Sequence, residues 1–130
     1  MPSDKTYAAL LDTKYNILAA QGFVAHMSLN AFLESQIPLY AVTRALEIVS
    51  EAARRLPEDM RQNHSHLPWR QIMGVGNIYR HEYDNVDAGF VWITVQEHLT
   101  PLLDMVSVEL TKYGEKYALS IEKIAQSNNQ

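Results

Sequence analysis

The sequence has no cysteine and no long apolar run. Without cysteine, the chain cannot form disulfide bonds or metal sites built on thiolate ligands. A membrane-spanning helix needs roughly 20 predominantly apolar residues, and no segment of the sequence approaches that length. Residues 1–22 also lack the pattern of a signal peptide. We therefore expect a cytoplasmic protein without membrane contacts.

Positive charge is also scarce, because 11 lysines and arginines face 15 acidic residues and the net charge is −4. A dedicated nucleic-acid-binding protein usually shows a basic face, so this balance argues against high-affinity binding of that kind. An RNA-cleaving enzyme needs only local positive charge, so the net charge does not exclude a ribonuclease. The chain lacks repeats and linkers, and its 130 residues, 47% of them hydrophobic, predict one domain with a single core.

Apolar residues recur at helical spacing from the start of the chain, which predicts a first helix over residues 4–21. Ser3 or Asp4 can cap this helix, and Gly22 is a natural C-terminal stop. The stripe that we expect to be buried consists of Tyr7, Leu11, Tyr15 and Leu18.

Two further helices are expected in the first half of the chain. Ser28 or Asn30 should open a short one, and a longer helix should run from about Pro38 to about Leu56. Small residues on the inner face of the longer helix would let another helix approach closely. This face consists of Ala41, Ala45, Ile48, Ala52 and Leu56.

Two groups of polar residues have the composition or spacing of functional sites, one for RNA and one for a metal ion. Arg54 and Arg55 would suit RNA contacts, but two arginines at a helix C-terminus more often form a solvated end that complements the helix dipole. Farther on, Arg61 and His66 have four residues between them, and His64 and His66 are two apart, as in some metal sites. A His-x-His pair faces one way only on a strand, and no third ligand is fixed nearby by the pattern. We expect a short turn or a short helical piece after Pro57, and we interpret the segment as an exposed loop without a metal.

Residues 69–87, WRQIMGVGNIYRHEYDNVD, carry the most distinctive polar cluster, which follows apolar positions at helical spacing. In a helix, Asn77 and His81 lie four residues apart and face the same way. Gly74 and Gly76 each cost about 1 kcal/mol relative to alanine, which a chain accepts for close packing or for a bend. By residue types alone, the ordinary interpretation is that His81 complements the dipole of its helix.

The last part of the chain predicts a long helix that extends to about Ile124. Asp87 is a good N-cap for it, and Pro101 should kink or split it. Its apolar face consists of Val91, Val95, Leu99, Leu102, Val106 and Leu110. Long amphipathic helices without an alternating strand pattern predict an all-α, up-and-down bundle of four to five helices. We expect residues 1–3 and 125–130 of this single domain to be frayed.

Residues 28–110 contain the run ALEIVSEAARRLPEDMRQNHSHLPWRQIMGVGNIYRHEYDNVD, followed by VWITVQEHLTPLL, which resembles the HepT-like branch of the HEPN superfamily. Members are small all-helical proteins, many of them ribonuclease toxins encoded beside a minimal nucleotidyltransferase that acts as the antitoxin. Their catalytic pattern is Arg, four residues, His, any residue and Tyr. His81 and Tyr83 match this pattern, and Asn77 matches the family's usual Asn. The Arg position holds Gly76 instead.

The resemblance implies a homodimer in which two copies of the motif line a shared cleft. It also implies metal-independent, cofactor-free RNA cleavage, in which the 2′-hydroxyl attacks the adjacent phosphate and leaves a 2′,3′-cyclic phosphate. His81 would then act as acid or base, and Asn77 would orient the reacting groups. Tyr83 would lie close to the phosphate. It would also accept AMP from the partner nucleotidyltransferase, which silences the toxin.

We expect Arg80 to supply the missing guanidinium. It lies one helical turn, about 6 Å, from Gly76 on the same face, and an arginine side chain spans that gap. A guanidinium in this place would stabilise the charge that grows on the phosphate. The alternative is that Arg80 only neutralises Glu82 or Asp84 in solvent, which contributes little stability.

Two other functions are also considered. The missing arginine at Gly76 favours a catalytically inactive module that binds a nucleotidyltransferase partner, RNA or a nucleotide without cutting RNA. A four-helix metal carrier would need inward-facing carboxylates. We set the carrier aside because Glu47, Glu51 and Glu97 fall on mixed or outward faces.

Overall fold

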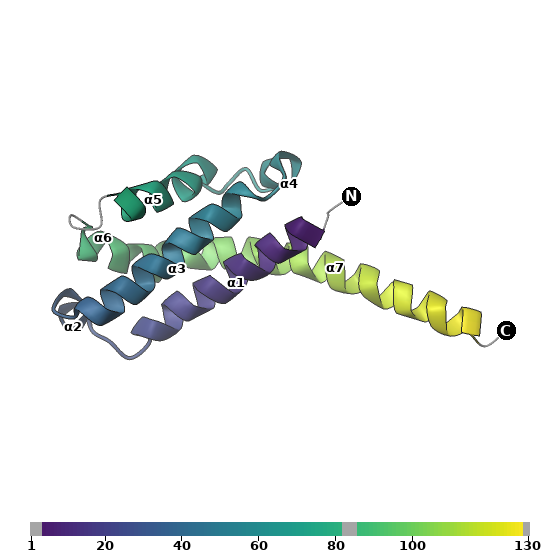
Figure 1. The fold of residues 1–130 in the computed structure, drawn as a ribbon, viewed down its shortest axis with the longest axis horizontal. Coiled ribbons are helices and arrows are strands. Elements are labelled where there is room, and N and C mark those ends of the chain that lie inside the picture. Colours follow the sequence, from purple (N-terminus) through teal and green to yellow (C-terminus); the bar gives the residue numbers. More distant parts are fainter. Residues whose placement is uncertain (1–3, 82–85, 129–130) are drawn as a thin grey trace.

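The computed structural model describes residues 4–81 and 86–128, with residues 115–124 and 127–128 described by their backbone only. Within these ranges every regular element is helical, and Figure 1 shows the long helices running up and down a bundle. The elements are α1 (Asp4–Val24), α2 (Leu29–Leu33), α3 (Gln36–Arg54), α4 (Glu58–Gln62), α5 (Trp69–His81), α6 (Ala88–Ile93), η2 (Thr94–His98) and α7 (Leu99–Asn128). The predicted all-α, up-and-down bundle is therefore confirmed.

α3 is the central helix of the bundle, with α1 on one side and α5 on the other. It begins at Gln36, slightly before the predicted start at Pro38, because the first turn of a helix tolerates proline. Several of its buried residues are small, and these residues let the neighbouring helices approach closely. They include Ala45, Ser50, Ala52 and Ala53.

The predicted buried stripe of α1 is wrong. Three of its members, Tyr7, Tyr15 and Leu18, are exposed, with Tyr15 at 60%, and Leu11 is half-buried. The face toward the bundle carries Thr6, Ala9, Leu10, Thr13, Ile17, Ala20 and Val24. α1 has apolar residues on both faces, so periodicity alone could not identify the inner one. Gly22 does not end the helix, which continues to Val24, and no glycine among the described residues has a positive φ.

Two predicted caps are confirmed. The Ser28 hydroxyl accepts a hydrogen bond from the Ala31 N–H at 3.1 Å and opens α2. The Asp87 carboxylate accepts one from the Phe90 N–H at 3.2 Å and opens α6. Each cap satisfies a backbone donor that has no partner within its helix.

The last helical segment keeps its predicted apolar face, because Val91, Val95, Leu99, Leu102 and Val106 are buried. A wide π turn, η2, precedes Pro101. Proline lacks an N–H and crowds the preceding turn, and the wide turn lets the chain continue without breaking the segment. α7 then extends beyond the other helices (Figure 1). Among the residues that the structure describes, no helix is both long enough and apolar enough to cross a bilayer.

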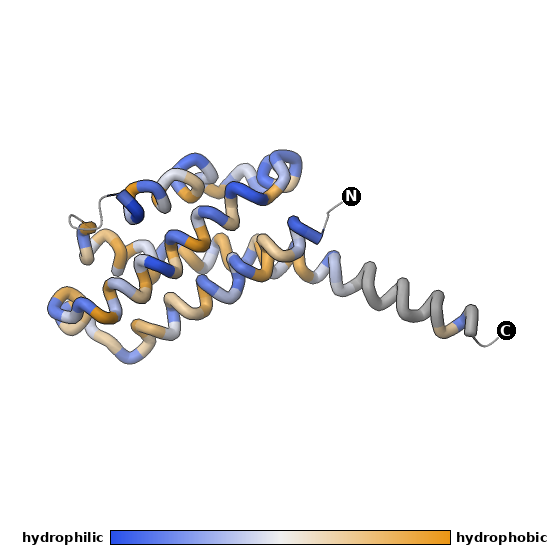
Figure 2. Tube along the Cα trace, viewed as in Figure 1, coloured by the Kyte–Doolittle hydropathy of each residue, from blue (hydrophilic) through white to orange (hydrophobic). Residues whose placement is uncertain are grey.

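The core lies where α1, α3 and the α6–α7 segment meet. Figure 2 shows apolar and hydrophilic residues alternating along these helices, as expected of amphipathic packing. The largest fully buried side chains are Phe32, Leu10, Ile17, Leu102 and Val42, each contributing about 1.5–3 kcal/mol. α5 buries only Gly76 and Tyr79 and leaves much of its surface open.

Candidate functional site

α5 presents the predicted site residues at its C-terminal end. Asn77 and His81 are both exposed, and their four-residue separation places them on one outward face. Arg80 is also exposed, on the flank nearer α3. Tyr83, Glu82 and Asp84 lie outside the described residues.

Gly76 packs directly against Ser50 of α3. Its N–H donates to the Ser50 hydroxyl at 3.0 Å, and that hydroxyl donates to the Met73 carbonyl, also at 3.0 Å. A Cβ on Gly76 would lie 2.7 Å from Ser50 Oγ and 2.8 Å from Ser50 Cβ. Gly76 is therefore needed for close packing within the chain. Gly74 has nothing within 4 Å of the corresponding position.

Arg80 is engaged by carboxylates of α3. Its Nε donates to Glu47 Oε1 at 3.3 Å, and one terminal nitrogen lies 3.9 Å from Glu51 Oε2. Glu47 also accepts from Arg44 at 3.0 Å, so two arginines and two carboxylates balance in this cluster. The Arg80 side chain is 45% exposed, and ion pairs at such positions contribute little stability.

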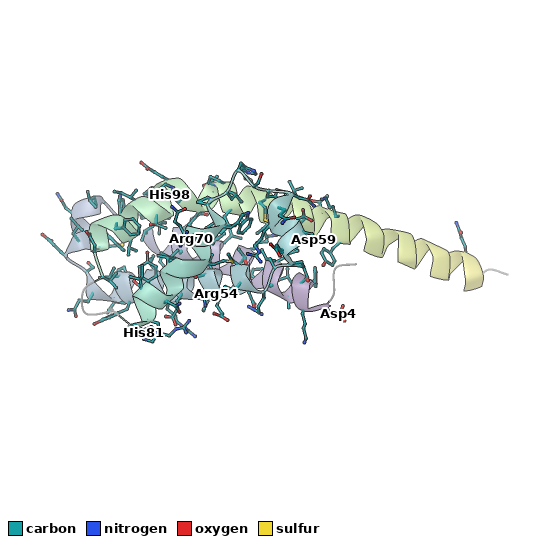
Figure 3. The ribbon with its side chains drawn as sticks, turned by 90° about the horizontal axis from the view of Figure 1, so that it is seen from above. Asp4, Arg54, Asp59, Arg70, His81 and His98 are labelled. Atoms are coloured by element: carbon teal, nitrogen blue, oxygen red, sulfur yellow. The ribbon has the colours of Figure 1, made fainter. Side chains whose placement is uncertain are left out.

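The two arginines at the end of α3 contact different helices. Arg54 Nε donates to the Met73 carbonyl of α5 at 2.7 Å. Arg55 instead pairs with Asp12 of α1 at 2.8 Å. Both are exposed, as expected of a solvated helix end, but each is also held in place. Figure 3 shows Arg54 on the same side of the molecule as His81.

His64 is not in an exposed loop, which corrects the sequence interpretation. Its Nε2 lies 2.7 Å from Glu109 Oε1, and its side chain is only 14% exposed. Glu109 also accepts from Lys112 at 3.2 Å. Burial alone would raise the pKa of Glu109, but the hydrogen bonds from His64 and Lys112 outweigh it and hold this pKa below its ordinary value. The described residues contain no group of three or more His, Asp or Glu placed to hold a metal ion.

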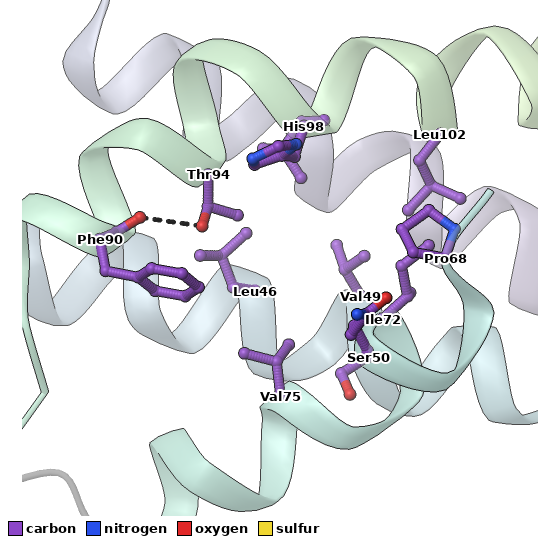
Figure 4. A pocket seen from close by; sticks show the side chains of 12 residues that line it. Leu46, Val49, Ser50, Pro68, Ile72, Val75, Phe90, Thr94, His98 and Leu102 are labelled. Atoms are coloured by element: carbon purple, nitrogen blue, oxygen red, sulfur yellow. Dashed lines mark hydrogen bonds between the residues drawn. The ribbon is translucent and has the colours of Figure 1, made fainter.

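An apolar cavity of about 420 Å³ lies between α3, α5 and the α6–α7 segment (Figure 4). Its few polar lining residues are Ser50, Gln71, Thr94 and His98. Burial raises the pKa of the nearby Tyr79 to about 12. The Tyr79 hydroxyl has no hydrogen-bond partner among the described residues. This phenol therefore stays protonated near neutral pH and does not suit proton transfer.

Positive charge is concentrated in the helices around the candidate site. All six arginines lie between Arg44 and Arg80, a stretch with four acidic residues and no lysine. The rest of the chain has 11 acidic residues and five lysines. Although the whole chain is negatively charged, α3, α4 and α5 carry a local excess of arginine. Arginine is the residue type that best binds phosphate.

The fold and the polar end of α5 define a small all-α domain of the HEPN type. The chain belongs to the HepT-like family, because the family model described as "Ribonuclease HepT-like" matches residues 14–108. This confirms the resemblance that the sequence suggested.

Curated relatives support the same assignment. A Methanocaldococcus jannaschii protein named "Putative RNase MJ1216" is 29% identical over 122 residues, which cover 94% of each chain. A Thermococcus cleftensis protein named "Probable ribonuclease HepT" is 33% identical over 100 residues, covering 77% of this chain and 89% of the relative. "Putative RNase MJ1380", also from M. jannaschii, is 33% identical over 86 residues, covering 66% of this chain and 79% of the relative. No solved structure gives a significant match.

Proposed function

We propose that the protein is the toxin of a toxin–antitoxin pair and cleaves RNA without a metal ion. The observation that carries this proposal is the exposed Asn77–His81 pair beside the arginine-rich surface of α3 and α5. Such a reaction needs a proton shuttle that titrates near neutral pH, which is the property of a histidine side chain. The site offers this shuttle together with cations for the phosphate.

The proposed reaction breaks one phosphodiester bond. His81 removes the proton of the RNA 2′-hydroxyl, and the 2′-oxygen attacks the adjacent phosphorus. The bond from phosphorus to the 5′-oxygen of the next nucleotide breaks, and that oxygen takes up a proton. The products are a 2′,3′-cyclic phosphate and a free 5′-hydroxyl. Asn77 orients the reacting groups, and Arg80 turns from Glu47 toward the phosphate as negative charge grows.

A homodimer would complete this site. The departing 5′-oxygen needs a proton donor, and the His81 of a second copy would provide it across a shared cleft. Ile78 on α5 and Phe90 and Ile93 on α6 are large apolar side chains about half exposed. A groove of about 710 Å³ between α5 and α6 is lined by Gly74, Ile78 and Phe90 among others. We propose that a second copy covers this surface.

Regulation would act through Tyr83. We propose that a minimal nucleotidyltransferase, the cognate antitoxin, transfers AMP to the Tyr83 hydroxyl. Because Tyr83 follows His81 by two residues, the added nucleotide would block the cleft and prevent RNA from reaching the imidazole.

The product ends test the proposed chemistry. The purified wild type, treated with EDTA and incubated with a short RNA, should yield fragments ending in 2′,3′-cyclic phosphate and beginning with 5′-hydroxyl, identified by mass spectrometry. Fragments with 5′-phosphate ends, or cleavage that stops with EDTA and returns with Mg²⁺, would contradict a metal-independent attack by the 2′-oxygen.

One observation favours a second candidate function. Ser50 occupies the space that a motif arginine at Gly76 would need, so this chain could instead be an inactive module that binds the nucleotidyltransferase or RNA. Wild type that binds such a partner and never cleaves RNA would support this candidate over the nuclease.

A further inference from the structure

α3 and α5 run antiparallel and meet in three successive contacts between paired residues. From the C-terminal end of α5 to its middle, the pairs are Arg80 with Glu47, Gly76 with Ser50, and Met73 with Arg54. The glycine that replaces the family's arginine is therefore flanked by two arginines. Arg80 lies on one side of it, and Arg54 reaches across from α3 on the other.

Arg54 is held beside the turn of α5 that contains Gly76, where the family's arginine would be attached. Its Nε donates to the Met73 carbonyl at 2.7 Å, and in a regular α-helix this carbonyl faces the Asn77 N–H. Asn77 follows Gly76 directly and lies one turn, about 6 Å, before His81. The hydrogen bond thus places the Arg54 guanidinium beside α5, about one helical turn before His81.

Arg54 pairs with no carboxylate in the part of the chain that the structure describes. Among the described residues, its only hydrogen-bond partner is the neutral Met73 carbonyl, and no ion pair involves it. Arg80, in contrast, shares Glu47 with Arg44 and also lies near Glu51. The two terminal nitrogens of Arg54 can therefore bind two phosphate oxygens without first leaving an acidic partner.

We propose that Arg54 is a phosphate-binding residue of the RNA site and that, together with Arg80, it supplies from α3 the positive charge that Gly76 cannot carry. This inference rests on the proposed ribonuclease function. The Ser50 hydroxyl and Arg54 share one acceptor, the Met73 carbonyl. The residue that excludes a side chain at Gly76 and the proposed replacement arginine therefore meet α5 at the same carbonyl group.

Arg55 gives a matched control for the test. It is the next residue of the same helix, is also exposed, and pairs with Asp12 of α1, away from α5. Arg54→Ala should lower kcat/KM for a short RNA by about 100-fold, the usual effect of losing one oriented donor to a reacting phosphate or oxyanion. Arg55→Ala should remain within about twofold of wild type. Arg54→Lys should recover little, because an ammonium group cannot form the bidentate contact.

A second variant separates charge from structure. Arg54→Gln can keep a hydrogen bond to the Met73 carbonyl while it removes the charge, so it should melt like wild type and still lose activity. Binding of a non-cleavable 2′-deoxy oligonucleotide gives an independent readout. For single strands each phosphate contact contributes about −0.7 to the slope of log K against log salt. Arg54→Gln should lose about that much of the slope, and Arg55→Ala should lose none.

The outcomes distinguish this inference from the proposed function. If wild type cleaves RNA and His81→Ala does not, but Arg54→Gln keeps full activity and the full salt slope, the inference is wrong and the ribonuclease proposal stands. If wild type neither cleaves RNA nor binds the oligonucleotide, both are overturned.

Discussion

The Ser50 hydroxyl of α3 hydrogen-bonds the backbone of α5 at Gly76. It accepts from the Gly76 N–H and donates to the Met73 carbonyl, both at 3.0 Å, and both of its hydrogen-bonding directions are used within the described structure. α3 and α5 can approach this closely only because residue 76 has no side chain. The position that carries the family's catalytic arginine is thus a packing position in this chain.

Gly76→Ala should destabilise the fold even though alanine is the better helix former. The added Cβ would lie 2.7 Å from Ser50 Oγ, and overpacking of this kind costs about 1–3 kcal/mol, more than the roughly 1 kcal/mol gained in helix propensity. The free energy of unfolding in urea measures the difference. Ser50→Gly should relieve the clash, so the double variant should be more stable than the two single losses predict. A Gly76→Ala protein as stable as wild type would contradict the observed contact.

Glu109 should make the fold sensitive to acid. Its pKa in the folded protein is lowered by His64 and Lys112, which outweigh the effect of burial. Its contribution to stability is therefore present above the unfolded pKa of a glutamate, about 4.3, and is lost as the pH falls through the lower folded value. Glu109→Gln should reduce the unfolding free energy at pH 7 by about 1–3 kcal/mol and flatten its decline in acid. The exposed Glu97→Gln is the control and should change neither, and an unchanged pH profile in Glu109→Gln would refute this role.

The proposed dimer should depend on the α5–α6 surface. Phe90→Asp places a charge on a half-exposed apolar residue beside the groove and should convert a dimer to a monomer. Light scattering at micromolar concentration gives the mass directly. Tyr15→Asp, on the exposed face of α1, should leave the mass unchanged. If wild type is already a stable monomer, the shared-cleft arrangement is wrong. If only Tyr15→Asp dissociates the dimer, the interface lies on α1.

Tyr83 should be the acceptor of AMP. After incubation with the proposed nucleotidyltransferase partner and ATP, intact-mass spectrometry should show one or more added AMP units on wild type and none on Tyr83→Phe. Tyr79→Phe serves as the control. Tyr79 is buried and its pKa is raised to about 12, so it should not accept AMP, and the Tyr79→Phe variant should be labelled like wild type. Labelling that persists in Tyr83→Phe would exclude this residue as the acceptor.

The sequence predicted where the long helices lie, but it predicted the buried face only where one apolar stripe is longer and more regular than any other. The face of the α6–α7 segment that carries Val91 and Val106 was recognised because its apolar residues recur at helical spacing over several turns, although α6 also exposes Phe90 and Ile93. α1 was misassigned because Tyr15 and its neighbours on the outer face are as apolar as the inner residues.

The contacts between helices could not be read from local spacing. His64 meets Glu109 across 45 residues, and Gly76 meets Ser50 across 26. Only the packed fold brings these partners together. The positions of Asn77 and His81 on one face, in contrast, follow from helical periodicity alone.

The central claim is that the end of α5 cleaves RNA, and a single-turnover cleavage assay with purified protein tests it most directly. Wild type should cut a structured RNA substrate, and His81→Ala should lose at least about 100-fold in rate while it melts and assembles like wild type, because general acid–base catalysis is worth about 100-fold or more. Arg80→Ala and Arg80→Lys should also lose most of the activity. Cleavage by His81→Ala at the wild-type rate would contradict the account.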